Sequence, residues 1–185
     1  NILRLENLTE IARVMHFNYI LPTYAWERPQ IEKKAAVFVL LESILHKSQY
    51  HRYFQAIPEE LKVYLVGKRQ DCLTIQQEYF QGRSTEVMEL KGSYPEKVSC
   101  ILEAAKEKYD YICIANMRNV ENIEPYSNEL SWQYSDWENI LGSREMVGNI
   151  VETFEKNQRL GLLIPPVPGY GELFAVMEDG WMGCY

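Results

Sequence analysis

The chain has 185 residues, which is enough for one domain of ordinary size and too few for two. Hydrophobic residues make up 46% of it, so a buried core can form. A formal net charge of −7, with the basic residues dispersed, argues against a nucleic-acid partner, because a phosphate-binding surface normally shows clustered lysines and arginines.

Two further properties bear on location. The longest apolar run is too short to cross a bilayer, and the first residues lack the order of a secretory signal. The four cysteines, Cys72, Cys100, Cys113 and Cys184, form no Cys-x-x-Cys pair, which favours packed free thiols over disulfides or zinc ligands. We therefore expect no membrane span and a location in the cytoplasm or at the inner face of the membrane.

The first 30 residues predict a helix followed by a linker. Leu8, Ile11 and Met15 recur at helical spacing, and Pro22 and Pro29 then interrupt the pattern. The chain begins with Asn rather than Met and ends without a capped helix, so we expect a fragment of a longer protein. Within it we expect a single α/β domain over residues 1–185, with a sheet core over 31–166 and a loop-rich tail over 167–185.

The core shows four short apolar runs, and each is followed by a stretch with helical character. The runs cover residues 35–41, 62–66, 85–90 and 109–115. Strands that alternate with helices predict an α/β fold with a mainly parallel sheet flanked by helices. Residues 160–164 (LGLLI) predict a fifth strand, which two prolines end.

Local signals mark the ends of the helices. Ser43 is a candidate N-cap for a helix that ends near residue 56, Ser93 for the helix after the third strand, and Ser143 for a helix that reaches about residue 154. Gly82 is expected to close the second of the four crossover helices in a left-handed conformation.

Binding residues are expected just after the strands, because a parallel sheet binds its ligands outside the carboxyl ends. Each candidate also has a structural interpretation, as a helix cap, a turn residue or part of a solvated loop. Arg suits a diphosphate, Asn suits a sugar hydroxyl, and a helix terminus suits a base or phosphate. The candidates are Glu42, Ser43, Gly92, Ser93, Asn116, Arg118 and Asn119.

An aromatic cluster begins at the end of the polar stretch over residues 116–134. Trp132 is a candidate platform for stacking a sugar ring, whereas Trp137 is better explained as a core residue. Asp136 and Glu138 are the nearest candidate bases.

Three strings carry a family resemblance. Residues 108–119 read KYDYICIANMRN, residues 137–143 read WENILGS and residues 157–166 read NQRLGLLIPP. In this order and approximate spacing they resemble the rhamnan synthesis protein F family, whose strings read YDYV, NLLGS and NPKLGLLFPP. The resemblance implies a sheet similar to the nucleotide-sugar-binding, GT-A-like half of a glycosyltransferase of bacterial polysaccharide or lipopolysaccharide synthesis.

The resemblance also implies the ligands: a nucleotide-sugar donor such as dTDP-rhamnose and a polysaccharide or lipid-linked acceptor. Several polar positions of the family differ here. The segment after the fourth strand lacks the family's histidines, and Gly92-Ser93-Tyr94 replaces its Gly-Arg-Asp turn. No Asp-x-Asp string occurs, so a divalent metal is not expected, and the sequence identifies no other cofactor.

Two other function classes remain open. A binding or assembly module could keep the fold and lack the chemistry, which the missing polar residues favour. A receiver domain of a two-component system needs a cluster of acids after the first strand, and Glu42 alone does not supply it.

Overall fold

The computed structural model describes residues 31, 33–45, 47–117 and 136–165. The predicted helix and linker over residues 1–30, the segment 118–135 and the tail over 167–185 lie outside this part of the chain. The single domain with these boundaries therefore stays a prediction.

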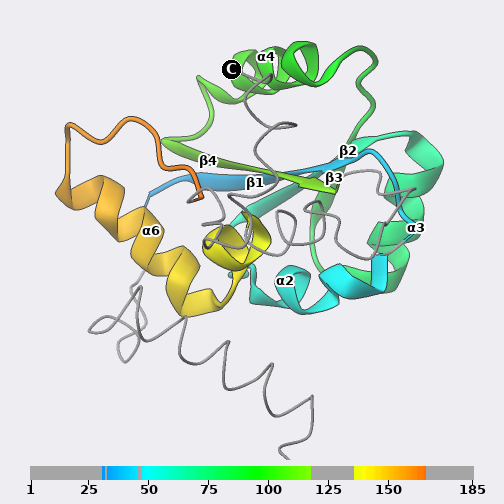
Figure 1. Cartoon of the computed structure of the whole chain (residues 1–185), viewed down its shortest axis with the longest axis horizontal. Coiled ribbons are helices and arrows are strands. Elements are labelled where there is room, and N and C mark those ends of the chain that lie inside the picture. The colour runs from blue at the N-terminus through cyan, green and yellow to red at the C-terminus, as the bar shows by residue number, and fades with distance from the viewer. Residues whose placement is uncertain (1–30, 32, 46, 118–135, 166–185) are drawn as a thin grey trace, which may run out of the picture.

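A four-stranded sheet forms the centre of the described residues, and all its pairings are parallel. The spatial order is β3-β2-β1-β4 (Figure 1). The predicted α/β class and parallel sheet are thereby confirmed. The strands are β1 (Ala35–Leu41), β2 (Lys62–Gly67), β3 (Thr85–Met88) and β4 (Tyr111–Met117).

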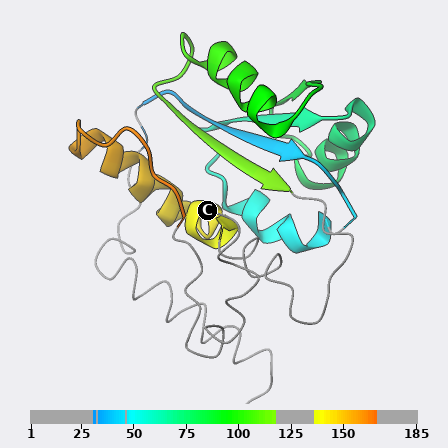
Figure 2. The ribbon, with the colours of Figure 1, turned by 45° about the horizontal axis from the view of Figure 1, so that its top comes forward.

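Helices cover both faces of the sheet. Helix α4 (Tyr94–Ala105) lies on one face, and α2 (His51–Ala56), α3 (Arg69–Tyr79) and α6 (Arg144–Lys156) pack on the other (Figures 1 and 2). A short 3-10 helix, η1 (Lys47–Tyr50), precedes α2, and residues 136–141 are also helical.

Strand β1 explains why two cores form. All seven of its residues are buried, and successive side chains point to opposite faces. Val37, Val39 and Leu41 join the cluster under α2, α3 and α6, whereas Phe38 and Leu40 join the cluster under α4. The continuous apolar run that identified this strand is therefore what a central strand of a parallel sheet requires.

Two predicted helix N-caps are confirmed, and the prediction for Gly82 is confirmed in part. Ser93 is the N-cap of α4 and forms a capping box with Glu96. Ser143 is the N-cap of α6, where its hydroxyl accepts a hydrogen bond from the Met146 backbone N–H at 3.1 Å. Gly82 has the predicted left-handed conformation, with a φ of 76°, but it lies two residues beyond Phe80, which is the C-cap of α3.

The fourth strand is two residues later than predicted. The backbone N–H groups of Asp110 and Tyr111 both donate to the Lys34 carbonyl, so the chain turns beside the start of β1 before β4 begins. At the other end, Asn116 and Met117 pair with Leu40 and Leu41. Asn116 is therefore a strand residue rather than a loop residue.

Two other predicted elements are wrong. No helix begins at Ser43, because the backbone N–H groups of Glu42 and Ser43 donate to the Met117 carbonyl and the first helical turn starts at Lys47. Residues 160–164 form no strand, and the side chains of Leu162 and Ile164 are 75% and 69% exposed.

The cysteine prediction holds in part. Cys72 is buried and Cys113 is partly buried, and burial raises the pKa of their thiols to about 11 and about 12. Cys100, expected on the packed face of its helix, is exposed.

Candidate functional site at the carboxyl edge of the sheet

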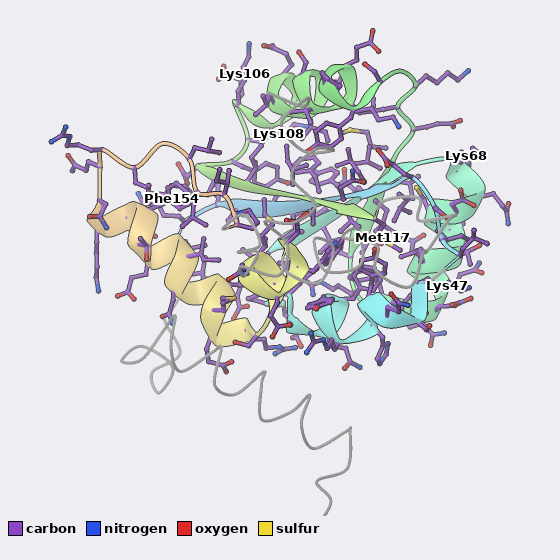
Figure 3. The ribbon with its side chains drawn as sticks, viewed as in Figure 1. Lys47, Lys68, Lys106, Lys108, Met117 and Phe154 are labelled. Carbon is purple, nitrogen blue, oxygen red and sulfur yellow. The ribbon has the colours of Figure 1, made fainter. Side chains whose placement is uncertain are left out.

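The direction in which successive strands are added to the sheet reverses between β1 and β4. Strands β2 and β3 lie on one side of β1, and β4 lies on the other. Leu41 and Met117 are paired at the carboxyl ends of the two strands. In open α/β sheets, ligands bind outside the carboxyl ends at such a point. Figure 3 shows Met117 at the end of β4, with Lys47 and Lys68 toward the same end of the sheet.

Glu42 and Ser43 lie at this edge, as predicted. Their backbone N–H groups donate to the Met117 carbonyl at 3.1 and 3.4 Å. These two hydrogen bonds hold the residues after β1 against the end of β4. The Ser43 hydroxyl accepts a hydrogen bond from the Leu45 N–H at 3.3 Å. The Glu42 side chain is exposed. Without a helix starting at Ser43, no helix terminus is available here for a phosphate.

Asn116 lies beside them on β4. Its backbone carbonyl accepts a hydrogen bond from the Trp137 indole N–H at 3.1 Å, which fixes the end of the strand. Its side-chain Oδ1 is buried and has no hydrogen-bond partner among the described residues. Most buried polar atoms are paired, so this oxygen needs an explanation.

Gly92 and Ser93 follow β3, at the far end of the row of strands. Three strand spacings, roughly 14 Å, separate β3 from β4. Gly92 has a φ of 107°, and a Cβ added there would lie 2.6 Å from the Glu96 carboxylate. The Ser93 N–H and hydroxyl both donate to that carboxylate, at 2.7 and 2.8 Å, and these bonds hold the Glu96 pKa below its usual range. Gly92 and Ser93 therefore both serve to start α4.

Glu138, one of the two candidate bases, is enclosed in a polar cluster. Its carboxylate forms an ion pair with Arg52 and accepts a hydrogen bond from the Tyr53 hydroxyl at 3.2 Å. The Arg52 guanidinium also lies over the Tyr53 ring, 4.4 Å from its centre. This cluster joins residues 136–141 to α2. Asp136, the other candidate base, is only partly buried.

Trp137 is a core residue, as the sequence indicated. It is 2% exposed and contacts the rings of Tyr50, Tyr53 and Phe54. Its neighbour Glu138 reaches the polar cluster because the 136–141 helix packs against α2. Three predicted binding residues, Arg118, Asn119 and Trp132, lie outside the described residues.

Two relevant residues were not predicted from the sequence. Lys68 directly follows β2 and is exposed, so the rule that singled out Glu42 applies to it as well. Arg52 is separated from Glu138 by 86 positions, and no local signal connects them. Only the long-range packing of residues 136–141 on α2 brings the two charges together.

Two further observations concern only the part of the chain that the structure describes. It contains no group of three His, Cys, Asp or Glu side chains that could hold a metal ion. None of its helices combines the length and apolar character that a bilayer span requires.

Comparison with known proteins gives one family. Residues 2–183 match the family model described as rhamnan synthesis protein F, and the chain therefore belongs to that family. The match extends the resemblance of the three local strings to nearly the whole chain. No curated protein and no solved structure matches.

Proposed function

We propose that this member of the rhamnan synthesis protein F family binds a nucleotide-activated sugar at the carboxyl edge of β1 and β4 and transfers the sugar to a growing polysaccharide. The donor is a deoxythymidine diphosphate sugar such as dTDP-rhamnose. The acceptor is a polysaccharide or a lipid-linked saccharide, and the reaction takes place on the cytoplasmic side of the membrane.

The observation that carries the proposal is the parallel pairing of β1 with both β2 and β4. This pairing brings the residues after Leu41 and the end of β4 to one place, where α/β sheets bind nucleotides. The family adds the context of rhamnan synthesis, in which sugars are the substrates. The sheet would then serve as the nucleotide-sugar-binding half of a glycosyltransferase.

Among the candidate bases, the proposal keeps Asp136, which is half-buried, because a general base must lie within reach of the acceptor hydroxyl. The Glu138 carboxylate already accepts hydrogen bonds from Arg52 and Tyr53 and is 4% exposed, so it suits a positioning role. Arg118 and Asn119 directly follow β4 in the sequence and remain the proposed contacts for the diphosphate and a sugar hydroxyl.

A second candidate function is a module that binds the sugar nucleotide without catalysing transfer. The enclosure of Glu138 favours it, because one of the two acids expected to do chemistry holds a helix in place instead.

A binding experiment with a matched pair of variants tests the proposal. Glu42 and Lys108 are both exposed, but Glu42 follows β1 at the carboxyl edge and Lys108 precedes β4 at the opposite end. Glu42→Trp places a bulky ring over the proposed site, and Lys108→Trp is the control. We expect dTDP-rhamnose, measured by calorimetric titration, to bind the wild type and Lys108→Trp equally and Glu42→Trp at least about tenfold more weakly.

Failure of the wild type to bind, or equal binding by both variants, would contradict the proposed site. Release of dTDP in the presence of an acceptor saccharide separates the two functions. A glycosyltransferase releases it with turnover, whereas a silent module binds the donor and leaves it intact.

A further inference from the structure

Asn116 places its side chain on the α4 face of the sheet, at the end of β4. It pairs with Leu40, which belongs to the cluster that Ile101 and Ala105 of α4 cover. The next residue, Met117, is buried in the cluster on the opposite face. The Asn116 amide therefore lies on one defined face of the carboxyl edge, next in the chain to the carbonyl that holds Glu42 and Ser43.

Hydrogen bonds hold the backbone around this amide in place, whereas the amide oxygen has no hydrogen-bond donor among the described residues. The Asn116 carbonyl is held by Trp137, itself 2% exposed, and the Met117 carbonyl receives two N–H groups. The Oδ1 atom is nevertheless buried without a donor among the described residues. A polar atom left in this state weakens the folded protein, so an asparagine that served packing alone would be a poor choice here.

We propose that Asn116 is a specificity contact of this edge, whose Oδ1 accepts a hydrogen bond from a neutral O–H or N–H group of the bound nucleotide sugar. The inference rests on the proposed function. An amide oxygen only accepts hydrogen bonds, and the oxygens of an ionised diphosphate offer no proton to it. The Asn116 Oδ1 atom therefore contacts the base or a sugar hydroxyl rather than the diphosphate.

Two variants test this role. Asn116→Leu replaces the amide with an apolar group of similar size, and Asn116→Ala removes the amide without adding bulk. Because each removes an unsatisfied buried oxygen, we expect the melting temperature of the free protein to stay unchanged or rise. We expect the Kd for dTDP-rhamnose to increase about tenfold. Asn149→Leu, at a buried asparagine of α6, is the matched control and should leave the Kd unchanged.

Titration with dTDP alone identifies the donor group. If the variants weaken dTDP and dTDP-rhamnose by the same factor, the donor belongs to the nucleotide. If they weaken only dTDP-rhamnose, it belongs to the sugar.

Two outcomes would overturn the inference and leave the proposed function standing. One is a wild type that binds while the Asn116 variants bind equally well. The other is a clear fall in the melting temperature of both variants, which would show that the oxygen has a structural partner in the free protein. If the wild type binds neither probe, the proposed function fails and the inference fails with it.

Discussion

Glu138 has 4% of its side chain exposed, and its carboxylate is held by Arg52 and Tyr53. Burial raises the pKa of the Tyr53 phenol, and Arg52 opposes part of that increase. The phenol therefore stays protonated and donates its hydrogen to the carboxylate. These three side chains therefore hold residues 136–141, which come after β4 in the chain, against α2, which comes after β1.

Glu138→Ala should lower the free energy of unfolding by about 2 kcal/mol, because it leaves the buried Tyr53 hydroxyl without its acceptor. The loss stays below that of a fully buried ion pair, since the Arg52 side chain is 40% exposed and can reach water. Urea unfolding followed by tryptophan fluorescence measures the change. Glu155→Gln, at an exposed position of α6, is the control, and an equal loss in both variants would show that the cluster contributes nothing.

At the scale of elements, α4 depends on the capping box at its first turn. The Ser93 N–H and hydroxyl hold the pKa of Glu96 below its usual value of 4.5, so the ionised carboxylate stabilises the helix. A depressed pKa gives stability that is present above pH 4.5 and lost as the pH falls further.

Glu96→Gln should therefore be less stable than the wild type at pH 7, and the difference should shrink as the pH falls below about 4.5. Melting temperatures across this pH range measure it. Glu107→Gln, an exposed residue beyond the end of α4, should show no such dependence. A difference that stays constant down to pH 3 would argue against the charge as its source.

The elements also show which features the sequence could predict. Strand β1 was predicted to the residue because all seven of its positions are buried and apolar. The end of β4 was missed because Asn116 reads as a loop residue, although pairing with Leu40 continues the strand through it. Residues 160–164 have the composition of a strand, yet the segment makes no strand pairing and leaves Leu162 and Ile164 exposed.

The candidate site was predictable to a similar extent. The rule that ligands bind at carboxyl strand ends singled out Glu42, Ser43 and Asn116, and the structure brings these three residues together. The same rule could not show that Gly92 and Ser93 lie far from these three residues, because the order of strands across a sheet depends on long-range packing. The partners of Glu138 and the unpaired oxygen of Asn116 likewise depend on tertiary packing.

At the scale of the whole molecule, two enclosed thiols couple stability to alkaline pH. Burial raises the pKa of Cys72 to about 11 and that of Cys113 to about 12, from an ordinary value of 9.0. Above pH 9 the unfolded chain releases these protons while the native state retains them. The free energy of unfolding should therefore fall as the pH rises from about 9 to about 11.

Cys113→Ala should reduce the slope of this decline, by up to about 1.4 kcal/mol per pH unit where one proton difference is fully expressed. Cys100→Ala should not, because that thiol is exposed. Urea titrations at several pH values compare the slopes. Identical slopes in all three proteins would show that the Cys113 thiol is not enclosed in solution.

The proposed function requires that the carboxyl edge of β1 and β4 hold the nucleotide sugar. Hydrogen–deuterium exchange of the wild-type chain, with and without saturating dTDP-rhamnose, tests it most directly. We expect slower exchange in peptides that cover residues 40–45 and 114–117, with no change over residues 105–110 at the opposite end of the sheet. Protection confined to residues 105–110, or no protection at either edge, would contradict it.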